Sequence, residues 1–248
     1  MAVAFLCTRV KDPDNDDYKK LMRVIQYLRG TQDITLTIEP GDHPNWWVDS
    51  LYAVHPDLRS HSGIIMMLGK GAMYSSSCKQ KLNTKSSTEA ELVGIDDAMG
   101  QVLWTHHFLA AQGEYVPTTT IYQDNKSTIL LAENGKGSSS KRTRHLNVRY
   151  YFVTDQIKKG HVKVAFCPTQ EMIADFFTKP LQGSLFVRMR EKILNLPASK
   201  IASVHRSVLE DQKKNMDLVS TRRKDMKNDV GKNKNDKNIQ DWDTRLAT

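Results

Sequence analysis

The sequence predicts a layered α/β fold built on a mixed sheet, with a charged tail behind it. Three observations carry this prediction. Short β-type runs separated by turns fill residues 45–80. One long helical pattern follows over residues 88–111. Beyond it, helix and strand patterns alternate as far as residue 178, which is typical of a sheet with parallel strands and helices on its faces.

Composition sets limits on the class of protein. The 248 residues are 39% apolar, enough for one core of ordinary size with appendages, and the formal net charge of +8 favours a polyanionic partner. The three cysteines lie far apart without a C-x-x-C pair, so neither a disulfide framework nor a thiolate zinc site is indicated. No apolar run approaches the roughly 20 residues of a membrane span, and the first ten residues do not form a signal peptide. We therefore expect an intracellular protein, in the cytoplasm or nucleus, without a membrane partner.

Residues 1–38 are expected to form a helical arm. Acidic residues at 12–17 cap a helix whose apolar positions, Leu21, Val24, Ile25 and Leu28, keep helical spacing and predict a core face. An isolated arm cannot bury such a face. It either packed against a part that this chain lacks, in which case the chain is truncated at its start, or docks on the domain that follows.

The central domain is expected over residues 39–196. Its first strand covers residues 46–52 and belongs to a three-strand antiparallel meander that ends near residue 77. After the long helix, the patterns predict a strand at 118–123, helices at 125–133 and 144–159, a strand at 161–167 and a final short helix at 171–178. Residues 197–248 are a separate segment. Positions 209–248 hold ten Lys or Arg against eight Asp or Glu with few aliphatic residues, which predicts disorder.

Four isolated acids fall on separate elements of this domain. Asp49 lies in the first strand, Glu91 near the start of the long helix, Asp124 at the end of a later strand and Asp175 on the last helix. Each has a structural alternative: an exposed strand residue, a capping box with Thr88, a helix N-cap and a solvated helical acid, respectively. Gathered at one edge of a sheet, four carboxylates repel one another unless cations neutralise them. Without a Cys/His set nearby, oxygen ligands favour Mg²⁺ or Mn²⁺.

Five runs of sequence, taken in order, closely resemble the ribonuclease H domain of copia-type retrotransposon polyproteins. They are VDSLYAVH (48–55), KLNTKSSTEAEL (81–92), YQDNKS (122–127), RHLNVRY (144–150) and ADFFTKPL (174–181). Residues 2–31 resemble the end of the reverse transcriptase connection region, so the resemblance covers residues 1–196. It implies a ribonuclease H-like three-layer fold with a mixed five-stranded sheet, in which three antiparallel strands are followed by two parallel ones.

The resemblance also implies a reaction. Asp49, Glu91, Asp124 and Asp175 match the metal-binding Asp-Glu-Asp-Asp set of the family, which implies two Mg²⁺ ions, with Mn²⁺ as a substitute. The implied activity is endonucleolytic hydrolysis of the RNA strand of an RNA/DNA hybrid, and the implied partners are that hybrid and the polymerase domain of a related polyprotein. We expect this chain to lack the polymerase and integrase parts, because no Tyr-x-Asp-Asp polymerase motif occurs in it.

Polar and basic residues around the start of the long helix, and in a second basic loop, are candidates for binding the hybrid through phosphates and 2′-hydroxyls. Solvated basic turns are the alternative for both segments. The candidates are Lys79, Lys81, Lys85, Ser87, Thr88, Asn125, Arg142 and Arg144.

Two departures from the family pattern leave other functions open. Leu51 lies on the strand face of Asp49, where the family usually carries a small residue, and we expect it to crowd the metal site. The connection at residues 169–171 contains no histidine. The alternatives are a catalytically decayed retroelement fragment that binds nucleic acid without cleaving it, and an integrase-like member of the same broad fold.

Overall fold

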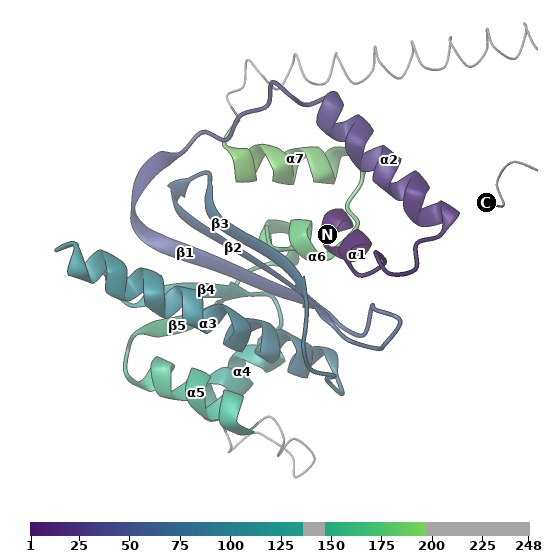
Figure 1. The fold of residues 1–248 in the computed structure, drawn as a ribbon. Coiled ribbons are helices and arrows are strands. Elements are labelled where there is room, and N and C mark those ends of the chain that lie inside the picture. Colours follow the sequence, from purple (N-terminus) through teal and green to yellow (C-terminus); the bar gives the residue numbers. More distant parts are fainter. Residues whose placement is uncertain (136–146, 197–248) are drawn as a thin grey trace, which may run out of the picture. The chain divides into compact units, whose positions relative to one another are not determined.

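The computed structural model describes residues 1–135 and 147–196, and Met1–Pro197 form one compact unit. A five-stranded sheet lies at its centre in the order β3-β2-β1-β4-β5 (Figure 1). The strands are β1 (Glu39–Leu51), β2 (His61–Lys70), β3 (Ala72–Lys79), β4 (Thr119–Gln123) and β5 (Val162–Phe166). Arg142, Arg144 and the predicted tail at 197–248 lie outside the described residues.

Strand directions follow the prediction. β1 pairs antiparallel with β2 and β2 pairs antiparallel with β3, whereas β1–β4 and β4–β5 are parallel pairs. β1 is therefore the central strand, with an antiparallel neighbour on one side and a parallel neighbour on the other. The predicted ribonuclease H-like fold class, with three antiparallel strands followed by two parallel ones, is confirmed in its strand order and directions.

Helices cover both faces of the sheet (Figure 1). On one face lie α3 (Ser87–Ala111), α4 (Lys126–Asn134) and α5 (Asn147–Lys158). On the other lie α6 (Asp175–Thr178) and α7 (Gly183–Leu194), together with α1 (Ala2–Cys7) and α2 (Asn15–Arg29) of the N-terminal arm. Among the described residues, no helix combines the length and apolar character that crossing a membrane requires.

The two faces have separate hydrophobic cores, because successive residues of a strand point to opposite sides. Ile64 and Met66 of β2 pack in the core beneath α3, whereas Ile65 and Met67 pack in the core beneath α6 and α7. A strand with apolar residues at consecutive positions is thus buried on both faces, as expected for a sheet between two helical layers.

The N-termini of α3 and α4 show that Glu91 and Asp124 do not cap these helices. α3 begins after Ser86, whose hydroxyl accepts from the Glu89 amide at 3.2 Å, and the Glu89 carboxylate accepts from the Lys85 amide at 2.7 Å. A capping box of Thr88 with Glu91 is therefore wrong, because Ser86, two residues before Thr88, caps the helix. α4 is capped by the Asn125 side chain, so Asp124 is not its N-cap.

The end of the domain contains more helix than predicted. The expected helix at 171–178 is divided into a 3₁₀ turn, η3 (Thr169–Glu171), and α6, because Met172 leaves helical geometry with ψ 87°. α7 was not predicted and is the last helix of the described residues. It buries Met189 and Ile193, four residues apart on one face.

The N-terminal arm docks on the domain, which is the second of the two alternatives. The Thr37 amide donates to the Leu194 carbonyl at 3.0 Å, and the Tyr27 ring meets the edge of Phe186 of α7 with centroids 5.8 Å apart. The predicted core face of α2 is wrong, however: Leu21 and Ile25 are exposed. Aromatic and backbone contacts therefore hold the arm.

Gly94 lets α3 approach β1 closely. A Cβ at this position would overlap the Ser50 hydroxyl and lie 3.3 Å from Val48 Cγ1. We expect Gly94→Ala to lower the free energy of unfolding by about 1–3 kcal/mol, since overpacking a tight contact forces the helix and strand apart. Urea denaturation measures this.

Gly100 is the matched control on the same helix. It is exposed, and a Cβ there would have no neighbour within 4 Å. Gly100→Ala should instead stabilise the protein by up to ~1 kcal/mol, because alanine has the higher helix propensity. Equal effects of the two substitutions would contradict the close approach of α3 to β1.

Candidate metal centre

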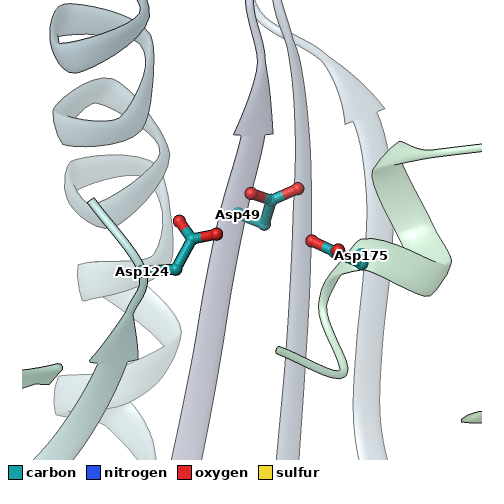
Figure 2. A group of neighbouring side chains, drawn as sticks. All are labelled: Asp49, Asp124 and Asp175. Carbon is teal, nitrogen blue, oxygen red and sulfur yellow. The ribbon is translucent and has the colours of Figure 1, made fainter. Parts of the chain in front are cut away.

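Three aspartates from distant parts of the chain meet near the carboxyl ends of β1 and β4 (Figure 2). Asp49 lies in β1, Asp124 follows the last residue of β4, and Asp175 opens α6. One carboxylate oxygen from each lies within 4.8 Å of those of the other two. Three carboxylate oxygens at this spacing form a donor set that hard divalent cations prefer, so the group could hold a metal ion.

Burial makes this arrangement unusual for acids. Asp49 and Asp175 are only 2% and 4% exposed, whereas Asp124 is half-buried. The alternatives of an exposed strand acid and a solvated helical acid are therefore wrong for Asp49 and Asp175. Negative charges that are this close together and shielded from water repel one another strongly, and a bound cation usually neutralises them.

Parallel and antiparallel pairing together place the three aspartates. β1 and β4 are parallel neighbours, so Asp124 comes at the same edge as the later part of β1, where Asp49 lies. On β2, Gly63 stands opposite Asp49. A Cβ there would lie 2.9 Å from the Ala174 carbonyl and 2.8 Å from Thr178 Cγ2, so the glycine gives α6 room to bring Asp175 close.

Side chains of the α6 segment hold the aspartates. The Thr178 hydroxyl donates a hydrogen bond to Asp49 Oδ2. Lys179 Nζ lies 2.7 Å from Asp175 Oδ1 and 3.9 Å from Asp49 Oδ2, so one ammonium group partly balances two carboxylates. Burial raises the pKa of Asp175 although Lys179 opposes the rise. The third aspartate has its own partner, because the Thr169 hydroxyl donates to Asp124 Oδ2 at 3.1 Å.

Glu91 is the fourth predicted acid and lies beside the three aspartates rather than within their group. It is 5% exposed in the first turns of α3, and its Oε2 accepts from Gln123 Nε2 at 3.1 Å. Burial, with the nearby charge of Asp49, raises the pKa of Glu91 to about 9. Since Ser86 caps the helix, no capping role explains this buried carboxyl.

The predicted nucleic-acid-binding residues fall into several settings. Lys81, Lys85 and Ser87 are exposed before and at the start of α3, whereas Thr88 is half-buried. Lys79 forms an ion pair with Asp57 at 2.6 Å. Asn125 uses its side-chain oxygen to accept from the Ser127 and Thr128 amides. Their role toward a hybrid stays a prediction.

Sequence reasoning did not single out Gln123, Lys179, Thr169 or Thr178 as parts of this region. Lys179 had a signal, since it follows Asp175 by four residues, the spacing of a helical ion pair. Gln123 had none for its bonds to Glu91 and Val48, because only the folded chain brings these residues next to it. Leu51, expected to crowd the site, is half-buried at the end of β1 opposite His61, and its effect stays a prediction.

Comparison with known proteins identifies the relatives. No family model matches the chain. The retrovirus-related Pol polyprotein from transposon RE2 of Arabidopsis thaliana is 30% identical over 190 residues, which cover 73% of this chain. The homologues of this chain are copia-type retrotransposon Pol polyproteins. The corresponding polyprotein from transposon TNT 1-94 of Nicotiana tabacum is 27% identical over 194 residues, or 77% of this chain.

This retrotransposon homologue spans only a small part of its relatives. It covers 13% of the RE2 polyprotein and 14% of the TNT 1-94 polyprotein.

Solved structures show a distant likeness. A ribonuclease H1 isolated from compost aligns with a TM-score of 0.42 at 10% identity, over 55% of this chain and 92% of that one. The prototype foamy virus ribonuclease H domain aligns with a TM-score of 0.38 at 12% identity, over 66% and 96%. Similarity at this level carries no weight for activity.

Proposed function

We propose that this chain is the ribonuclease H domain of a copia-type retrotransposon Pol polyprotein, and that it hydrolyses the RNA strand of RNA/DNA hybrids with divalent cations. One observation carries the proposal: three carboxylate oxygens of Asp49, Asp124 and Asp175 lie within 4.8 Å of one another. The retrotransposon homologues supply the nucleic-acid context.

In this proposal Asp49, Asp124, Asp175 and Glu91 hold two Mg²⁺ ions, for which Mn²⁺ can substitute. Such a pair of ions activates a water molecule and stabilises the leaving oxygen of a phosphodiester. The donor set supports hard cations, because it contains only carboxylate oxygens. Thr178 orients the Asp49 carboxylate by donating to it. Lys179 lowers the repulsion within the group.

The polar start of α3 is the proposed contact surface for the hybrid. Lys85 and Ser87 are exposed there, and Ser87 lies about one helical turn before Glu91, so a backbone bound to this turn would lie near the acids. The Thr128 hydroxyl donates to the Thr88 carbonyl at 3.2 Å, which fixes this turn against α4. Hydroxyl and ammonium groups suit phosphates and 2′-hydroxyls, and the polymerase part of a related polyprotein is the second proposed partner.

A cleavage assay with the full chain tests the function. With Mg²⁺ we expect cuts within the labelled RNA strand of an RNA/DNA hybrid, and none in single-stranded RNA, in double-stranded DNA or in the presence of EDTA. Asp124→Asn is the negative control, since an amide keeps the shape of the side chain but not its charge.

Mn²⁺ is included because Leu51 is expected to crowd the site, and Mg²⁺ demands the stricter coordination geometry. Binding of the hybrid without cleavage under either ion, measured by fluorescence anisotropy, would overturn the enzyme and support the decayed binding fragment instead.

A further inference from the structure

Gln123 is a completely buried amide at the end of β4, next to the proposed metal centre. It is 0% exposed. Its Nε2 donates to Glu91 Oε2 at 3.1 Å and to the Val48 carbonyl at 3.3 Å. Its Oε1 accepts from the amides of Asp124 at 2.8 Å and Asn125 at 3.1 Å. A glutamine amide has two donor hydrogens and two acceptor sites, so these four bonds use its full capacity.

The partners of Gln123 belong to three different elements, and each element carries one of the proposed metal-binding acids. Glu91 is itself such an acid on α3. Val48 directly precedes Asp49 in β1, and the Asp124 amide belongs to the residue that supplies the third carboxylate. One side chain therefore connects a helix, the central strand and the turn after β4.

Each bond restrains a different degree of freedom. The bond to Glu91 fixes the direction of a long carboxylate side chain that would otherwise choose among several rotamers. The two bonds accepted by Oε1 hold the Asp124 and Asn125 amides, so they fix the backbone of the turn after β4. The position of Asp124 at the end of the strand is fixed with it. The bond to Val48 holds this assembly against β1.

We propose that Gln123 is a positioning residue, whose amide holds Glu91 and the Asp124 turn in the arrangement that binds metal ions together with Asp49. This proposal rests on the proposed function, because it gives Gln123 a role in the same site. Gln123 touches no reacting group. It acts through the two acids that it orients, in the way that groups behind metal ligands tune affinity elsewhere.

Gln123→Met tests the proposal in the full chain. Methionine keeps the length and approximate volume of glutamine but can neither donate nor accept these four hydrogen bonds. We expect Mn²⁺ affinity, measured by isothermal titration calorimetry, to fall by about 10- to 100-fold. Cleavage of the hybrid should fall in kcat, with KM for the hybrid nearly unchanged.

Gln156→Met is the matched control. Gln156 is also buried, at 7% exposed, and its amide bonds to Asp155 and His161 on elements that carry none of the four acids. This variant should lose stability, as Gln123→Met does, but should retain its Mn²⁺ affinity.

Two further variants keep the test decisive. Gln123→Asn retains an amide that is one methylene too short to bridge Glu91 and the turn, so it should show the same loss of affinity if Gln123→Met does not fold. In a Glu91→Gln background, Gln123→Met should cost less affinity than in wild type, because residues that act through one another are not additive.

The outcomes separate the two proposals. Unchanged Mn²⁺ affinity in folded Gln123→Met or Gln123→Asn would overturn the positioning role and make Gln123 a structural residue. If wild type binds Mn²⁺ but cuts no hybrid, and the Gln123 variants still bind Mn²⁺ more weakly, the proposed enzyme fails while the positioning role stands.

Discussion

Replacing Asp49 by asparagine should reduce metal-dependent cleavage of an RNA/DNA hybrid by ~10³-fold or more, equivalent to about 4 kcal/mol of transition-state stabilisation. Asp49 lies on the central strand, is 2% exposed and shares the 4.8 Å group with both other aspartates. An amide keeps its shape but removes the negative charge that would attract the cations. Measurement of kcat/KM with Mg²⁺ decides the result.

The same substitution should not destabilise the metal-free protein. Removing one of three clustered negative charges lowers their repulsion, so we expect Tm in EDTA to stay level or rise. Asp42→Asn is the matched control, since Asp42 lies on the same strand but is exposed. It should retain full cleavage. An Asp49→Asn protein within threefold of wild-type activity would refute the metal centre.

The second large effect is expected for Glu91→Gln. We predict a loss of cleavage of about 10²- to 10³-fold, because glutamine matches the shape of glutamate but cannot provide a charged ligand. Glu89→Gln is its control, two residues earlier in α3. The Glu89 carboxylate accepts from the Lys85 amide just before α3, and a glutamine oxygen can accept the same bond, so this variant should cleave normally.

Glu91 should also give the metal-free protein a characteristic dependence on pH. Its folded-state pKa is raised to about 9 by burial and by Asp49, above the ordinary value of 4.5. The unfolded chain loses this proton first, so the stability that Glu91 contributes is full below about pH 4.5 and is lost as pH rises toward 9. Glutamine does not ionise, so Glu91→Gln should not lose stability in this way as pH rises.

The Tm of Glu91→Gln in EDTA should therefore rise relative to wild type between pH 5 and about pH 9. Differential scanning fluorimetry across this range measures the difference. Mg²⁺ should stabilise wild type more at high pH, since a cation favours the ionised carboxylate. A difference in Tm that does not vary with pH would contradict the raised pKa of Glu91.

Much of the fold was predictable because hydrophobic periodicity is a local property of the chain. The long helix was predicted at 88–111 and spans Ser87–Ala111, and the strand predicted at 118–123 spans Thr119–Gln123. The start of α3 shows where such reasoning stops. Ser86-x-x-Glu89 and Thr88-x-x-Glu91 both fit the capping-box pattern, and only the structure shows that Ser86 caps the helix.

Elements and contacts that depend on distant partners were harder to predict. α7 was missed because Pro180 and Gly183 are residues that usually end a helix. Met189 and Ile193 nevertheless keep helical spacing, and Ile193 packs in the core beneath α6 and α7. The α2 stripe was predicted to be buried, but the sequence contains no information about whether a partner covers it. The meeting of the acids was predictable as a hypothesis from strand ends, whereas the Gln123 contacts were not.

The hydrogen bond from Thr178 to Asp49 joins residues separated by 129 positions. The entropic cost of closing so long a loop is met only when most of the domain has folded. The three aspartates therefore come together only in the folded domain, because no single segment of the chain contains all of them. A cation that binds only this cluster would stabilise the native state by linkage, so the rise in Tm at a given metal concentration would measure the affinity of the folded domain for that cation.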